Sequence, residues 1–199
     1  IGSYVGGHRG VTVRAPDHRG QHDVALASPP MGLDSFAYKL FLLLHLGTVV
    51  VGFGSSFVYP MISVRARKLP AEQAHALNSA ALGISKMVTT PVIYASGAFG
   101  LVLVILSDGA IEFSAPWISA AFLLFIVAAC VAAFLHNPNL KAIDELEAKL
   151  VSGEITSAGG PPPEVAELEA RGKKAAMFGG ILHLMWLLLM IDMIWKPGQ

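Results

Sequence analysis

Four separate stretches of this 199-residue chain are long and apolar enough to cross a lipid bilayer. A membrane-spanning helix needs about 20 mostly apolar residues, because it rises about 1.5 Å per residue through a hydrocarbon core about 30 Å thick. The composition agrees with this, since only 14% of the residues are charged, whereas soluble domains carry about 25%. The sequence therefore predicts an all-α membrane protein, a four-transmembrane-helix bundle whose spans are residues 36–60, 82–107, 116–136 and 175–195.

The basic residues of the connecting segments predict how this bundle is oriented. The segment after the first span contains Arg65, Arg67 and Lys68, residues 137–174 contain five more lysines and arginines, and the segment after the second span contains none. Segments rich in lysine and arginine stay in the cytoplasm. We therefore expect a multi-pass protein of a bacterial inner membrane, with the N-terminus and the C-terminus outside.

Residues 1–35 precede the first span and are polar, with many glycines, histidines and arginines. Such a segment buries too little apolar surface to fold alone, so we expect an extended outer N-terminal tail that contacts other membrane protein subunits. A metal site at His18 and His22 is the alternative, although the nearby Pro16 and Gly20 disfavour the helix that this spacing needs. The zero net charge gives no indication of a nucleic acid partner. The residues predicted to contact a partner are His8, Arg9, His18, Arg19 and His22.

Residues 137–174 predict a cytoplasmic helical hairpin between the third and fourth spans. Four apolar residues recur at helical spacing in residues 139–151, and Glu145 and Lys149 can pair one turn apart. Residues 157–163 read SAGGPPP, which cannot continue a helix, and a helical pattern resumes in residues 164–171. The hairpin serves either as a solvated stalk that fixes the last two spans side by side or as a docking surface for a soluble partner.

Two histidines, His45 and His183, lie inside predicted spans, where ionisable residues are costly and often functional. Counted from the ends of their spans, both fall near the middle of the membrane. Two imidazoles at one depth of a four-helix bundle could ligate a haem iron from opposite faces. Alternatively, each histidine forms a hydrogen bond with a hydroxyl or carbonyl group of a neighbouring helix.

Other polar residues of the spans have simpler interpretations. Asp192, near the outer end of the fourth span, is predicted to form a structural ion pair with Lys196 or with Lys39. The single cysteine, Cys130, lies inside an apolar run, so it is expected to be a small packing residue.

The first span, which runs from His45 through Gly52, Phe53 and Gly54 to Tyr59 and Pro60, resembles the opening helix of a group of small bacterial membrane proteins. That group includes an uncharacterised predicted integral-membrane family and, more distantly, the HemJ-type protoporphyrinogen oxidases. The closing Lys196-Pro197 is similar to theirs as well. The resemblance implies a bundle of four spans, with haem b at His45 and a terminal lysine at Lys196. Gly52 and Met61 stand where those enzymes carry a tryptophan and an arginine.

Two functional interpretations follow. The first is an accessory subunit of a bacterial membrane energy-conversion complex, respiratory or photosynthetic, which stabilises the assembly and holds haem, pigment or lipid. The second is a haem-b-dependent enzyme similar to the protoporphyrinogen oxidases. The first accounts for more of the sequence, since it also explains the tail and the hairpin as partner contacts. The sequence identifies no catalytic residue.

Overall fold

The computed structural model describes residue 2, residues 32–155, residue 160 and residues 162–198. The predicted partner contacts at His8, Arg9, His18, Arg19 and His22 lie outside the described residues, as does the alternative metal site.

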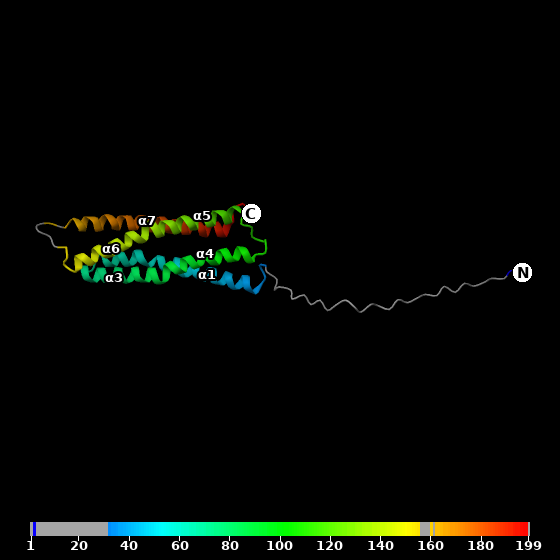
Figure 1. The fold of residues 1–199 in the computed structure, drawn as a ribbon, viewed down its shortest axis with the longest axis horizontal. Coiled ribbons are helices and arrows are strands. Elements are labelled where there is room, and N and C mark those ends of the chain that lie inside the picture. The colour runs from blue at the N-terminus through cyan, green and yellow to red at the C-terminus, as the bar shows by residue number, and fades with distance from the viewer. Residues whose placement is uncertain (1, 3–31, 156–159, 161, 199) are drawn as a thin grey trace. The chain divides into compact units, whose positions relative to one another are not determined.

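The described residues form helices joined by short segments, and the all-α prediction is confirmed (Figure 1). Four continuous helical segments are long and apolar enough to cross a membrane, as the sequence predicted. The first comprises α1 (Phe36–Ser56) and α2 (Val58–Ala66); the second α3 (Ala71–Ile84), the π-helical segment η1 (Ser85–Thr89) and α4 (Thr90–Leu106); the third α5 (Pro116–Val131), the π-helical segment η2 (Ala132–His136) and α6 (Asn137–Val151); the fourth is α7 (Pro163–Trp195).

All four segments are longer than the apolar stretches that predicted them. They contain 31, 36, 36 and 33 residues, which correspond to about 46–54 Å, whereas the hydrocarbon core is about 30 Å thick. The additional helical residues lie at one end of the four segments, where α3 packs against α6 and α6 packs against α7. The predicted hairpin is therefore only half of a larger helical extension, which we define as α2, α3, α6 and residues 163–174.

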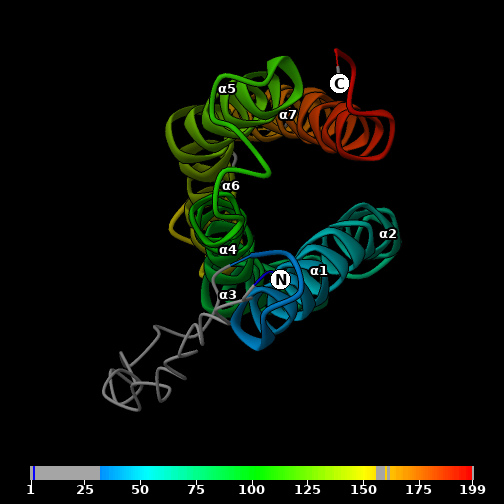
Figure 2. The same ribbon diagram turned by 90° about the vertical axis from the view of Figure 1, so that its right-hand side faces the viewer.

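Small residues let the helices approach one another closely. Figure 2, which looks along the helices, shows α1 beside α4 and α5 beside α7. A methyl group added at Gly52 of α1 would lie 2.9 Å from Cγ1 of Ile93 in α4, and one added at Gly97 of α4 would overlap the ring of Phe125 in α5. Glycine at these positions thus permits the close packing that holds helices together in lipid.

The two π-helical segments lie at the same depth. α4, which follows η1, has 17 residues, and α5, which precedes η2, has 16. Residues 107–115 join these two helices, so η1 and η2 begin at similar distances from that loop. Single π-helical turns inside α-helices frequently occur at functional sites.

The packing predicts that Gly97→Val destabilises the bundle, because the added atoms must displace the Phe125 ring. Overfilling a packed site costs about 1–3 kcal/mol, and the expected loss in the free energy of unfolding in mixed micelles is of that order. The matched control is Gly47→Val on α1, where nothing lies within 4 Å of an added Cβ atom. Equal losses in the two variants would contradict the packing described here.

Candidate functional site

His45 lies on α1 and reaches across to α4. Its Nδ1 atom donates a hydrogen bond to the backbone carbonyl oxygen of Ser96, at 2.8 Å. Its ring packs on Gly100, since a Cβ atom added there would lie 3.2 Å from His45 Cε1. The absence of a side chain at Gly100 therefore gives the imidazole its place between the two helices.

The hydrogen bond to Ser96 leaves the other ring nitrogen of His45 free. A carbonyl oxygen can only accept, so Nδ1 carries the proton, and Nε2 of the neutral ring presents a lone pair. Within the described part of the chain Nε2 has no hydrogen-bond partner, and it is accessible rather than buried. Histidines that bind metals usually donate their second nitrogen to a carbonyl or carboxylate in this way.

His183, on α7, uses both of its ring nitrogens within the chain. Nδ1 donates to the carbonyl oxygen of Gly179 at 2.7 Å, and Nε2 lies 3.1 Å from the hydroxyl oxygen of Ser56 on α1. The ring packs against Phe57, with the ring centroids 4.7 Å apart. His183 thus forms an interhelical hydrogen bond, which was the alternative to haem ligation. Its Nε2 atom could bind a metal only if the hydrogen bond to Ser56 were broken.

The two histidines do not face each other, so the expectation of two imidazoles at one depth is wrong. His183 meets α1 at Ser56, eleven residues beyond His45, which is a distance of about 16 Å along the helix. Two axial ligands of one iron must lie within a few ångströms of each other. His45 and His183 therefore cannot hold one haem between them in this arrangement, and the candidate site reduces to His45.

A second group of polar side chains lies on α1, α2 and η1. The hydroxyl of Thr89, in η1, is 3.0 Å from that of Ser55 and also forms a hydrogen bond with that of Tyr59. Thr89 is only 4% exposed. Buried hydroxyl groups need such partners in an apolar environment, so this group joins the first and second spans where η1 interrupts the α-helix.

The predicted ion pair of Asp192 is not formed within the described residues. Lys39 lies instead 3.5 Å from Asp34, and the Nζ atom of Lys196 lies 5.2 Å from the centre of the Trp117 ring. Lys196 has a left-handed backbone conformation (φ 45°) that ends α7 and turns its side chain away from the helix. Asp192 is buried beside this turn, and its Oδ2 atom has no partner in the described part of the chain.

In the helical extension, His75 of α3 faces two carboxylates of α6. Its Nδ1 atom lies 3.8 Å from Asp144 and 3.7 Å from Glu147, and Asn78 donates to both oxygens of Glu147. Sequence reasoning missed this cluster, because it depends on the register between α3 and α6. Within the described ranges no three histidine, cysteine, aspartate or glutamate side chains are placed to hold a metal ion, so the cluster is an interhelical contact.

His136 occupies the last position of η2, beside α7. Its Cε1 atom would lie 3.9 Å from a Cβ atom added at Gly179, the residue whose carbonyl oxygen accepts from His183. The Nδ1 atom of His136 is buried and lacks a partner among the described residues. Both imidazoles therefore lie against the same turn of α7.

The contact between Ser56 and His183 predicts a measurable coupling between the first and fourth spans. In a double-mutant cycle of Ser56→Ala and His183→Ala, the interaction free energy should be about 0.6 kcal/mol and at most about 1.7 kcal/mol, the range of interhelical hydrogen bonds in membrane proteins. The free energy of unfolding in mixed micelles provides the measurement.

Thr48→Ala combined with His183→Ala is the control, because the Thr48 hydroxyl donates only to carbonyl groups of its own helix. These two changes should be additive. A Ser56 cycle that is also additive would refute the contact.

Comparisons of the chain with protein-family models, with curated proteins and with solved structures gave no match. The resemblance carried by the first and fourth spans thus stays a prediction from the sequence.

Proposed function

We propose that the protein is an accessory subunit of a bacterial membrane electron-transfer complex and that it contributes His45 as an axial ligand of a haem b. The observation that carries this proposal is the Nε2 atom of His45, which has no hydrogen-bond partner among the residues that the structure describes. His45 lies nine residues into α1, about 14 Å along the helix. A lone pair at this depth has no water to bond with, so it needs a ligand or a partner protein.

The surroundings of His45 support a contact outside the chain. The first segment, Phe36–Ala66, is the least buried of the four. In its most apolar stretch of 18 residues, 6% is buried inside the protein, whereas the value is 17–22% for the other three segments. α1 packs mainly along α4, and the positions of Gly47 and Gly54 are open. α1, whose His45 Nε2 atom has no partner among the described residues, is therefore also part of the least buried segment.

Among the described residues, His45 is suited to supply one ligand of a haem iron. The hydrogen bond from Nδ1 to Ser96 fixes the tautomer and the orientation of the His45 ring, as expected of a protein ligand to iron. A bound haem would supply one-electron transfer. Because His183 is engaged by Ser56, a second axial ligand would come from a partner subunit or a small molecule, which favours an assembly over a solitary protein.

The oxidase interpretation receives no comparable support. The resemblance assigns a role to Lys196 together with His45, but Lys196 lies over Trp117 of α5, whereas His45 lies between α1 and α4. No contact in the described part of the chain links these two residues, so we do not propose the enzymatic activity.

The proposal predicts that the protein, extracted in mild detergent, has a Soret band and travels with other subunits. His45→Ala should abolish the band, because it removes the ligand. His183→Ala is the matched control and should retain the band, since its imidazole serves only the bundle. Absorption spectroscopy and mass spectrometry of the co-purifying proteins provide the measurements.

The outcomes separate the two parts of the proposal. A colourless protein whose partners are lost in His45→Ala would refute the haem and retain the accessory role, with His45 as a direct subunit contact. A colourless protein that purifies alone would refute both.

A further inference from the structure

The geometry points to a binding site for one anionic phospholipid, with its phosphate at Lys86 and one acyl chain in a groove between α4 and the third segment. This inference is independent of the proposed function. It assigns the lipid to the membrane leaflet on the side of the helical extension.

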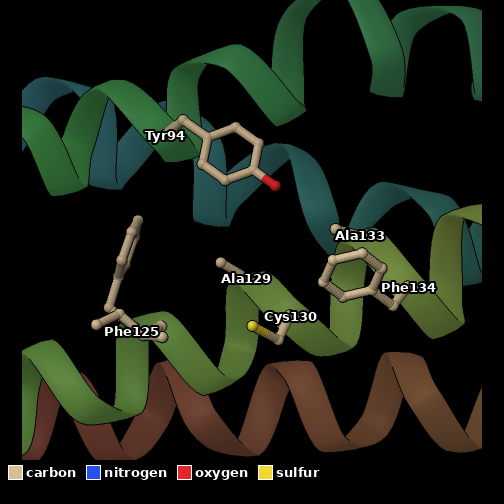
Figure 3. Close-up of a pocket in the computed structure, with 7 residues that line it drawn as sticks. Tyr94, Phe125, Ala129, Cys130, Ala133 and Phe134 are labelled. Carbon is tan, nitrogen blue, oxygen red and sulfur yellow. The ribbon is translucent and has the colours of Figure 1, made fainter.

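The groove is apolar and opens to the side of the bundle (Figure 3). Its volume is about 230 Å³. From Phe125 to Phe134 it follows α5 and η2 for nine residues, about 14 Å, which is close to the thickness of the hydrocarbon core of one leaflet, about 15 Å. Its lining comprises Tyr94 of α4 and, from the third segment, Phe125, Ile126, Ala129, Cys130, Ala133 and Phe134.

Lys86 lies in η1, at about the depth of Phe134 in η2, where the groove begins. It precedes Tyr94 by eight residues, about 12 Å along the axis of the second segment. Lys86 is exposed, within η1, and it forms no ion pair in the described ranges. Its charge is therefore available to a ligand.

The chemistry around Lys86 favours a lipid phosphate. Its neighbours Ile84, Met87 and Val88 are exposed apolar residues, with Met87 exposed to 81%, so this side of η1 faces lipid. A lysine at such a position extends its ammonium group to the headgroup layer, where a phosphate can neutralise it. The acyl chain of the same molecule then runs from Lys86 towards the middle of the membrane, the direction in which the groove extends from Phe134 to Phe125.

The test is native mass spectrometry of the full chain after equilibration with an equimolar mixture of phosphatidylglycerol and phosphatidylcholine in mild detergent. The wild type should retain phosphatidylglycerol preferentially. Lys86→Gln should lower this preference about fivefold, the factor that corresponds to about 1 kcal/mol for one lysine at an anionic membrane surface. Lys86→Arg should keep it, and Lys174→Gln, which removes another exposed lysine, should leave it unchanged.

The groove is tested separately by filling it. Ala129→Phe should reduce the retention of both lipids, whereas Leu123→Phe, at a lipid-facing position of α5 outside the groove, should not. Circular dichroism checks that the variant folds, and Ala133→Phe replaces it if it does not.

An unchanged preference in Lys86→Gln would overturn the phosphate site, and full retention in both filled variants would overturn the groove. Excess inorganic phosphate should not displace the lipid. Displacement would show that a free anion, rather than a lipid, is the ligand of Lys86.

Discussion

The structure depends on one constraint, which is that a polar group within hydrocarbon must find a partner inside the protein. Helices meet it for the backbone, and hydrogen bonds between helices meet it for most side chains. Ser55 and Thr89 pair across the first two spans, and Ser56 and His183 pair across the first and the fourth. These bonds add little net stability, yet breaking one leaves an unpaired group in lipid, so they fix which helix faces which. The same constraint applies to the Nε2 atom of His45, which, like Nδ1 of His136 and Oδ2 of Asp192, has no partner in the described part of the chain.

The four spans could be predicted from the sequence because hydrophobicity over about 20 residues is a local property, and so could the helix of residues 139–151. The lengths of the helical segments could not. α2 and α3 continue beyond the apolar stretches of the first two spans because α2 packs on α3 and α3 packs on α6, and these are tertiary contacts. The π-helical segments η1 and η2 also have no sequence signal that we recognised, because spans that are apolar on every side have no apolar stripe whose shift would reveal an extra residue in a turn.

The candidate site was predictable only in part. The predictions about it that were wrong share one physical cause. Counting residues from each helix end gives a depth for His45 and for His183, but not the displacement of α7 along α1. That displacement is set by contacts between α1 and α7, such as the packing of Phe53 against Trp186 and the hydrogen bond between Ser56 and His183. Similarly, a spacing of four residues suggested that Asp192 pairs with Lys196, yet the left-handed backbone at Lys196 ends the helix and directs its ammonium group to the Trp117 ring. Side-chain pairing across helices requires the register, which a single sequence does not contain.

The exposed surface of α1 is the physical reason why we propose a partner at this helix. In a water-soluble bundle, a helix as little covered as α1 would be unstable, because its apolar face would meet water. In a membrane, lipid covers that face without penalty, so α1 can remain bound chiefly to α4 while its other side stays open. Lipid chains, however, cannot satisfy a nitrogen lone pair. The apolar surface of α1 therefore tolerates either lipid or protein, whereas His45 tolerates only a group that accepts its lone pair, and this difference distinguishes a specific contact from general solvation by the bilayer.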